Sequence, residues 1–106
     1  MHLMQQPSVS IVVPVYNEVP NQRDDSFRLR IQRLLALLRP GDELVLVDGG
    51  SSDFSWPSIQ TLVFHPQISA IQSTKGRALQ MNAGAAKARG DALLFLHADT
   101  VLGIEA

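Results

Sequence analysis

The chain has 106 residues, a hydrophobic content of 45% and a formal net charge of −1, which is enough for one domain with a modest core. The near-neutral, mixed charge offers no basic face and argues against nucleic acid as a partner. The sequence has no cysteine, which excludes disulfides and thiolate metal sites, and no apolar stretch is as long as a membrane span. We therefore expect a cytoplasmic protein without an integral membrane segment.

The first part of the chain predicts a strand followed by a helix. Residues 9–15 (V-S-I-V-V-P-V) are β-branched and mostly apolar, which is typical of a strand. The strand should end near Pro14 or have a free side there, because proline has no N–H for a sheet. After a polar loop, apolar residues recur at helical spacing over residues 27–38 and predict an amphipathic helix of about four turns. Residues 24–26 (D-D-S) offer its N-cap, and the Pro-Gly pair at 40–41 ends it.

The middle of the chain predicts a strand, a short helix and a further strand. Residues 44–47 (L-V-L-V) form an apolar strand, and residues 49–53 (G-G-S-S-D) form a flexible turn. Ser55 could cap a short helix over residues 57–64, which has a proline in its first turn. Residues 68–72 then suggest a short strand.

The last predicted helix and strand differ from the earlier ones. Residues 75–89 are rich in alanine, and such small side chains let a helix lie close to a sheet. Gly84 in its middle costs about 1 kcal/mol relative to alanine, which indicates close packing or a ligand at that point. Gly90 ends the helix. The apolar run at residues 91–97 (D-A-L-L-F-L-H) is typical of a strand buried on both faces.

The alternation of strands and helices with short connections predicts an α/β domain with a parallel sheet and right-handed crossovers. In such sheets ligands bind beyond the carboxyl ends of the strands. Three strand ends should meet at that edge. Their polar and turn residues are Tyr16, Asn17, Glu18, Asp48, Gly49, Gly50, Ser51, Ser52, Asp53, His97 and Asp99.

The charges at this edge indicate a ligand that combines a metal with an anion. The carboxylates gathered there repel one another unless a positive group is present. Lys75 and Arg77 lie at the start of the alanine-rich helix, where free backbone N–H groups also favour an anion. Carboxylates beside an anion site suit a metal–diphosphate ligand, because the cation links protein oxygens to phosphate oxygens.

Each of these signals also has a purely structural explanation. Asn17 and Glu18 are ordinary loop residues, and Asp48 before two glycines suits a turn. Lys75 and Arg77 suit a solvated helix start. His97 could simply end a strand, and a lone carboxylate such as Asp99 is weak as a metal site.

Two enzyme classes fit the sequence poorly. Ser51 and Ser52 lie near no evident catalytic base, which argues against a serine nucleophile. The turn after the first strand is V-Y-N-E-V-P, and it lacks the G-x-G-x-x-G pattern of dinucleotide-binding domains.

Three segments together resemble family 2 glycosyltransferases, which are nucleotide-sugar-dependent enzymes of the GT-A fold. They are I-V-V-P-V-Y-N-E (11–18), L-V-L-V-D-G-G-S-S-D (44–53) and the run from K-G-R-A-L-Q-M-N-A-G to F-L-H-A-D-T (75–100). The match is to a bacterial branch with D-G-G-S and H-A-D-T in place of the commoner D-D-G-S and D-A-D-D. It spans nearly all of the chain but only the N-terminal, nucleotide-binding half of a usual member. The implied fold is a truncated GT-A type, a Rossmann-like three-layer α/β/α domain with a mostly parallel sheet, and residues 1–106 form this single partial domain.

The resemblance implies roles for single residues. The turn from Val15 to Glu18 would border the base and ribose, and Asp48 would hydrogen-bond the base. Arg77 and Asn82 match the segment that lines the nucleotide side of the cleft. From the residues and the resemblance together, the expected substrate-binding set is Val15, Tyr16, Asn17, Glu18, Asp48, Gly49, Lys75, Arg77 and Asn82. The implied donor is a UDP- or GDP-linked sugar, and the acceptor is open.

The resemblance also implies a divalent metal, Mn²⁺ or Mg²⁺. Asp99 matches the last acid of the family's D-x-D motif, which holds the metal against the diphosphate. His97 takes the first acidic position of that motif. Because imidazole is softer than carboxylate, this exchange favours Mn²⁺ over Mg²⁺.

Two further interpretations stay open. No residue can be assigned as the general base that an inverting transfer needs, so the chain alone should have little or no activity. It could instead be a non-catalytic, nucleotide-binding or self-associating half-domain, because its last strand would form an apolar sheet edge; this predicts a homo-oligomer. A nucleotidyltransferase would need a glycine-rich, basic loop after the first strand, and V-Y-N-E-V-P is not one.

Overall fold

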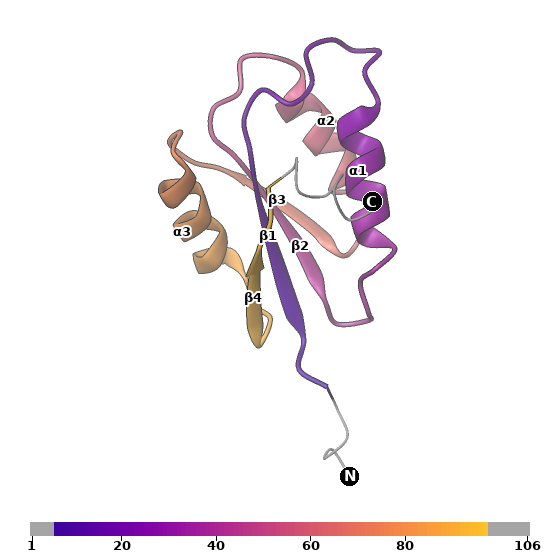
Figure 1. Ribbon diagram of the computed structural model, residues 1–106, viewed down its shortest axis with the longest axis vertical. Helices are drawn as coiled ribbons and strands as arrows, with labels where there is room; N and C mark the ends of the chain where they lie inside the picture. The colour runs from indigo at the N-terminus through magenta and orange to yellow at the C-terminus, as the bar shows by residue number, and fades with distance from the viewer. Residues whose placement is uncertain (1–5, 98–106) are drawn as a thin grey trace.

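A computed structural model describes residues 6–97, in which four strands and three helices alternate (Figure 1). This confirms the predicted order of elements. Helix α1 ends at Leu35 rather than near residue 38, because Leu37 and Leu38 donate to carbonyls only three residues back. No helix in the described range is long and apolar enough to span a membrane. The elements are β1 (Val9–Val15), α1 (Ser26–Leu35), β2 (Glu43–Asp48), α2 (Ser55–Leu62), β3 (Ile68–Gln72), α3 (Arg77–Lys87) and β4 (Ala92–Phe95).

The four strands form one parallel sheet in the order β3-β2-β1-β4. The chain first steps from β1 to β2 to β3 in one direction. It then returns through α3 and places β4 on the other side of β1. Figure 1 shows α1 and α2 on one face of the sheet and α3 on the other, as right-handed crossovers require when the direction reverses. The predicted three-layer α/β/α arrangement is confirmed.

The core has two layers because successive strand residues point to opposite faces of the sheet. On one face, Ile11, Val13 and Val15 of β1 belong to the larger apolar cluster, to which α1 and α2 contribute. On the other face, Val12 lies in a smaller cluster with residues of β2, and Ala83 of α3 packs against it. The helical spacing of the predicted helix is also confirmed, since α1 buries the residues Phe27, Ile31 and Leu34.

Helix α3 lies so close to the sheet that Gly84 leaves no room for a side chain. A Cβ atom added there would lie 2.3 Å from Cγ1 of Val12 and 3.0 Å from Cγ2 of Val47. Of the two explanations that the sequence offered for this glycine, close packing is therefore the one that the structure supports.

Two helix starts differ from the sequence prediction. Asp25 takes the N-cap position of α1, but no side-chain hydrogen bond caps the helix. Asp24 instead accepts a hydrogen bond from the backbone N–H of Ser26 at 2.9 Å. Helix α2 begins at Ser55 with Phe54 at its N-cap, and the hydroxyl of Ser55 instead accepts hydrogen bonds from the backbone N–H groups of Glu18 and Val19.

The prediction that the last strand is buried on both faces is wrong for the described residues. Leu93, Leu94 and Phe95 of β4 are 45%, 45% and 43% exposed. Within residues 6–97, β4 pairs only with β1, and α3 packs mainly on β1 and β2. The apolar run therefore forms an exposed sheet edge, which the sequence also suggested.

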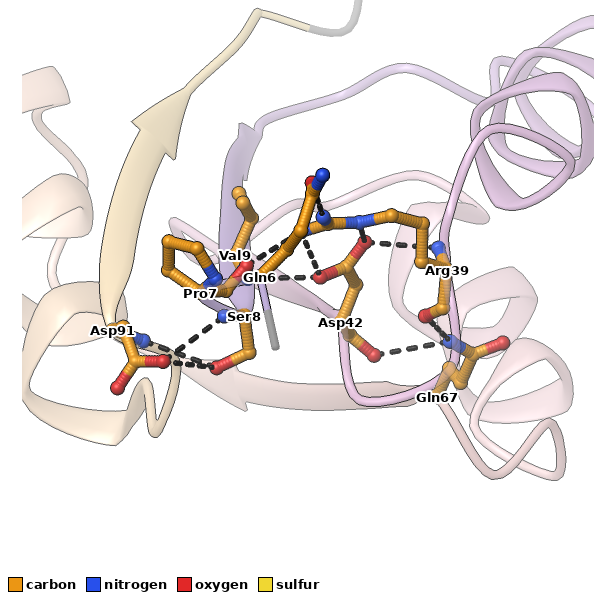
Figure 2. A network of polar contacts seen from close by, with 8 residues as sticks. All are labelled: Gln6, Pro7, Ser8, Val9, Arg39, Asp42, Gln67 and Asp91. Carbon is orange, nitrogen blue, oxygen red and sulfur yellow. Dashed lines mark hydrogen bonds and ion pairs between the residues drawn. The ribbon is translucent and has the colours of Figure 1, made fainter. Parts of the chain in front are cut away.

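At the amino ends of the strands, Asp42 ties the start of β1 to the turn before β2 (Figure 2). Its carboxylate accepts from the backbone N–H of Val9 at 2.9 Å and from that of Arg39 at 2.8 Å, and it pairs with Nε of Arg39 at 3.1 Å. Gln67 donates to the main-chain carbonyls of Arg39 and Asp42, both at 3.0 Å. The hydrogen bonds from the Arg39 side chain and backbone lower the pKa of Asp42 to about 2.

Replacing Gly84 by alanine tests the close contact of α3 with the sheet. Helix propensity alone would stabilise the variant by about 1 kcal/mol, but the added methyl group collides with Val12. We expect Gly84→Ala to lower the free energy of unfolding by about 1–3 kcal/mol, the usual cost of overpacking, as measured by urea unfolding. The exposed control Ala86→Gly should lose only the propensity difference. A more stable Gly84→Ala variant would contradict this packing.

The lowered pKa of Asp42 predicts a loss of stability in acid. A carboxyl group with a depressed folded-state pKa stabilises fully above its ordinary value of 3.8, and this contribution is lost as the pH falls toward 2. Asp42→Asn should cost about 1–3 kcal/mol at neutral pH, because buried donors lose a charged acceptor. The variant should also show a flatter decline in unfolding free energy between about pH 4 and pH 2. An unchanged slope in Asp42→Asn would refute the assignment.

Candidate functional site

The carboxyl ends of β1 and β4 lie side by side at the point where the strand order reverses. Helix α1 leaves β1 toward one face of the sheet, whereas α3 reaches β4 along the other face. Ligands of open α/β sheets bind at such a switch point. A cavity of about 140 Å³ lies there, and its lining residues are Pro14, Val15, Tyr16, Glu18, Arg77, Gln80 and His97.

A second, smaller cavity adjoins the first. It measures about 100 Å³ and shares Pro14, Arg77 and His97 with it. Met81 of α3 and Phe95 of β4 are among its further lining residues. The two hollows together follow the groove between α3 and the ends of β1 and β4.

The structure brings together five of the candidate residues named from the sequence. These are Val15, Tyr16, Glu18, Arg77 and His97, which line the same cavity. They come from three different elements or the loops beside them, as expected from the convergence of strand ends.

The remaining candidates are placed differently. Lys75 lies at the rim, with its ammonium 4.2 Å from the centre of the Tyr16 ring. Asn82 is exposed on α3 and lines neither cavity. Asp99 lies outside the described residues.

Asp48 is buried and holds its own turn together. One carboxylate oxygen accepts from the backbone N–H groups of Gly50 at 3.1 Å and Ser51 at 3.0 Å. The other accepts from the hydroxyl of Ser51. Asp48 is fully buried. These contacts are the turn chemistry that the sequence left open, and contact with a base stays a prediction for Asp48.

Asn17 joins the turn after β1 to the turn after β2. Its φ angle is +50°, a left-handed conformation that asparagine tolerates better than most residues. Its side-chain oxygen accepts from the backbone N–H of Ser52 at 2.9 Å, and its own N–H donates to the hydroxyl of Ser51 at 2.8 Å. The two turns therefore form one connected rim.

Glu18 continues the same rim toward α1 and α2. Its backbone N–H donates to the buried hydroxyl of Ser55 at 2.7 Å. Its carboxylate lies 3.6 Å from Nη2 of Arg30, a buried residue of α1. Asp53 accepts from the N–H of Val19 at 3.0 Å. The carboxylates at this edge are thus balanced by backbone donors and one arginine.

Sequence reasoning missed Gln80, which is buried and lines the main cavity. Its position was available as a signal, because Gln80 and Gly84 are four residues apart and share one face of a helix. A glutamine on the face that packs closely on a sheet must find partners for its amide.

The metal site stays a prediction. Among residues 6–97, no three His, Cys, Asp or Glu side chains gather closely enough to hold an ion. His97 contributes one imidazole to the cavity, beside the cationic Arg77. Its expected partner Asp99 lies outside this range.

A larger cavity lies at the amino ends of the strands, but its polar side chains are already occupied by contacts within the protein. It measures about 800 Å³ and includes Ser8, Arg39, Asp42 and Asp91 in its lining. These side chains already bond to one another or to the backbone: Asp91 accepts from Ser8 at 3.0 Å, and Arg39 pairs with Asp42. Their polar groups serve the fold at the amino ends of the strands, where α/β sheets do not usually bind ligands.

Two curated relatives carry the same name, undecaprenyl-phosphate 4-deoxy-4-formamido-L-arabinose transferase. The protein of Pectobacterium carotovorum is 35% identical over 99 residues, which are 87% of this chain and 29% of the relative. The protein of Photorhabdus laumondii is 35% identical over 106 residues, with 93% of this chain and 31% of the relative covered. The chain thus spans less than a third of the length of these relatives.

Solved structures share the fold. The mannosyltransferase PcManGT from Pyrobaculum calidifontis, in complex with GDP-Man and Mn²⁺, gives a TM-score of 0.73 at 22% identity over 91% of this chain and 28% of that one. TarS residues 1–349 of S. aureus, in complex with UDP-GlcNAc, gives a TM-score of 0.67 at 20% identity, and the match covers 87% of this chain and 26% of that one. This likeness confirms the expected Rossmann-like fold of GT-A type.

The family model described as glycosyl transferase family 2 matches residues 10–105. The match includes all three segments on which the resemblance rested and every element of the sheet except the first residue of β1. This chain therefore belongs to glycosyl transferase family 2.

Proposed function

We propose that this chain is the donor-binding part of a glycosyltransferase that uses a UDP- or GDP-linked sugar. The observation that carries the proposal is the cavity at the switch point, where Tyr16, Glu18, Arg77 and His97 meet. Membership of family 2 supports it. So do the nucleotide sugars present in the complexes of PcManGT and TarS.

The cations at the rim suit the diphosphate of the donor. Arg77 lines the cavity at the first residue of α3 and is exposed, so its guanidinium can reach an anion in water. Lys75 is held over the ring of Tyr16, a contact worth about 0.5–1 kcal/mol at an exposed site. The backbone N–H groups at the start of α3 add partial positive charge.

The turns after β1 and β2 suit the base and ribose. Asn17 and the turn held by Asp48 fix the rim through hydrogen bonds to Ser51 and Ser52. In this proposal Asp48 and Gly49 shape the floor of the base site, and Tyr16 and Glu18 border the sugar of the nucleoside. Asn82 would contact the donor only at its outer end, because it is exposed beyond the cavity.

A divalent cation would be held by Asp99 and His97 together with diphosphate oxygens. When bound, it would supply a Lewis acid that stabilises charge on the departing nucleoside diphosphate. Arg77 lines the same cavity as His97, so a cation alone would meet repulsion there. We therefore propose that metal and nucleotide bind together, with Mn²⁺ preferred because of the imidazole.

We propose that the acceptor site and the general base lie in a part of the enzyme outside this chain, which spans 29–31% of its two relatives. The names of those relatives make undecaprenyl phosphate the first acceptor to assay. The cytoplasm is the compartment we propose, which the lack of cysteine fits.

Calorimetric titration with UDP and GDP tests the donor site. We expect binding that tightens when Mn²⁺ is present, whereas Mn²⁺ alone should bind weakly. Arg77→Ala should raise the Kd about tenfold, equivalent to about 1.4 kcal/mol, and Asp99→Ala should remove the effect of the metal. Lys87→Ala, at the far end of α3, is the matched control. No metal-dependent binding by a protein shown to be folded would refute the proposal.

The exposed edge at β4 favours a second candidate, a self-associating half-domain without catalytic activity. Within residues 6–97 the strand pairs on one side only and has exposed apolar side chains, which invites pairing with another copy. We expect a homo-oligomer in light scattering at high concentration. Leu94→Lys should shift it toward the monomer, whereas Leu37→Lys on the 61% exposed Leu37 should not. A wild type that stays monomeric would exclude this candidate.

A further inference from the structure

The side-chain amide of Gln80 links three segments that border the candidate donor site. Gln80 lies on α3 and is 4% exposed. Its Nε2 donates to the main-chain carbonyl of Val15 at 3.0 Å and to that of Val47 at 2.9 Å. Its Oε1 accepts from the backbone N–H of Gly76 at 3.3 Å. One side chain therefore contacts the end of β1, the end of β2 and the start of α3.

The amide suits this place because its two N–H groups diverge. Val15 and Val47 lie on neighbouring parallel strands, whose backbones run about 4.8 Å apart. A primary amide presents two donors and one acceptor, and all three are used here. Leaving such buried groups without partners would cost about 1–3 kcal/mol for each group. The amide is also neutral, so it does not disturb the charges of Arg77 and Glu18 in the same cavity.

The buried position of the Gln80 amide requires glycine at position 49. A Cβ atom at position 49 would lie 2.8 Å from Cδ and Oε1 of Gln80 and 2.9 Å from Nε2. Gly49 is also bonded to β1, since its N–H donates to the carbonyl of Val15 at 2.9 Å. A side chain at position 49 would therefore displace the amide and break its contacts with both strands.

We propose that Gln80 is a positioning residue of the donor cleft and that Gly49 provides the space for it. The amide fixes the distance between the turns that follow β1 and β2, and it fixes both relative to the basic start of α3. This places Tyr16, Glu18 and Arg77 around one cavity. The inference rests on the proposed donor-binding function, in which these residues contact the nucleotide.

Hydrogen exchange measured by NMR tests the positioning role of Gln80 without any ligand. Gln80→Met keeps the length of the side chain and removes its donors and acceptor. We expect exchange at the amides of Gly76, Asn17 and Ser51 to become about tenfold faster, while that of Leu34 in α1 stays unchanged. Gln60→Met, at an exposed position of α2, is the matched control. Unchanged exchange at Gly76, or an equal increase at Leu34, would overturn the positioning role.

Nucleotide affinity tests the consequence for the site. Gln80→Met should raise the Kd of the folded protein for UDP or GDP with Mn²⁺ about tenfold. It should also lower the urea midpoint, because buried backbone groups lose their hydrogen-bond partners. Gly49→Ala should weaken nucleotide binding as well, because the added methyl group displaces the Gln80 amide. This variant tests the same contact if Gln80→Met folds poorly. The double variant Gly49→Ala/Gln80→Ala should lose less affinity than the sum of the losses in the single variants Gly49→Ala and Gln80→Ala.

The outcomes separate this inference from the proposed function. If the wild type binds nucleotide and Gln80→Met and Gly49→Ala bind equally well, the positioning role is wrong and the donor site stands. If the losses in the double variant simply add, Gly49 and Gln80 are not coupled and the role of Gly49 is wrong. If the folded wild type binds neither nucleotide, the donor-binding proposal fails, and the role of Gln80 toward a donor fails with it.

Discussion

The contact between α3 and the sheet is the constraint on which the rest of the structure depends. Gly84 lets the helix lie directly on Val12 and Val47, and this packing occupies the face opposite α1 and α2. The chain can then return past β2 and add β4 beside β1. Gly90 completes the approach, because a Cβ there would lie 2.6 Å from Oγ of Ser10. Small residues in α3 and in the turn after it thus allow the reversal of direction and, with it, the cavity between β1 and β4.

The two ends of the sheet differ in how their polar groups are used. At the amino ends, Asp42 and Arg39 bond to each other and to the backbone, and the low pKa of Asp42 reflects those donors. At the carboxyl ends, the carboxylate of Asp48 also accepts hydrogen bonds from its own turn. Arg77, by contrast, is exposed and lines a cavity with His97. We therefore propose the carboxyl ends of the strands as the site of a ligand with negative charge, although a larger cavity lies at the amino ends.

Much of the fold could be predicted because it depends on local patterns. Helical and strand periodicity sufficed for the order of elements, and strand ends sufficed to bring Tyr16, Glu18, Arg77 and His97 together. For β4 the sequence left both a buried strand and an exposed sheet edge open, because an apolar run does not reveal whether a neighbour covers it. The sequence also could not decide whether Asp48 accepts hydrogen bonds from its own turn or from a ligand, since D-G-G-S suits both. Gln80 escaped notice because its partners are backbone carbonyls of two distant strands.

The central claim is that a nucleotide donor binds between the ends of β1 and β4, and mapping of chemical shifts tests it most directly. Amide signals of the wild-type protein would be followed during titration with UDP or GDP in the presence of Mg²⁺. If the donor binds there, the largest shifts occur at the amides of Tyr16, Arg77 and His97, whereas those of Ser8 and Arg39 stay unchanged. Shifts concentrated at the amino-edge cavity around Arg39 and Asp91, or no shifts in a folded protein, would contradict it.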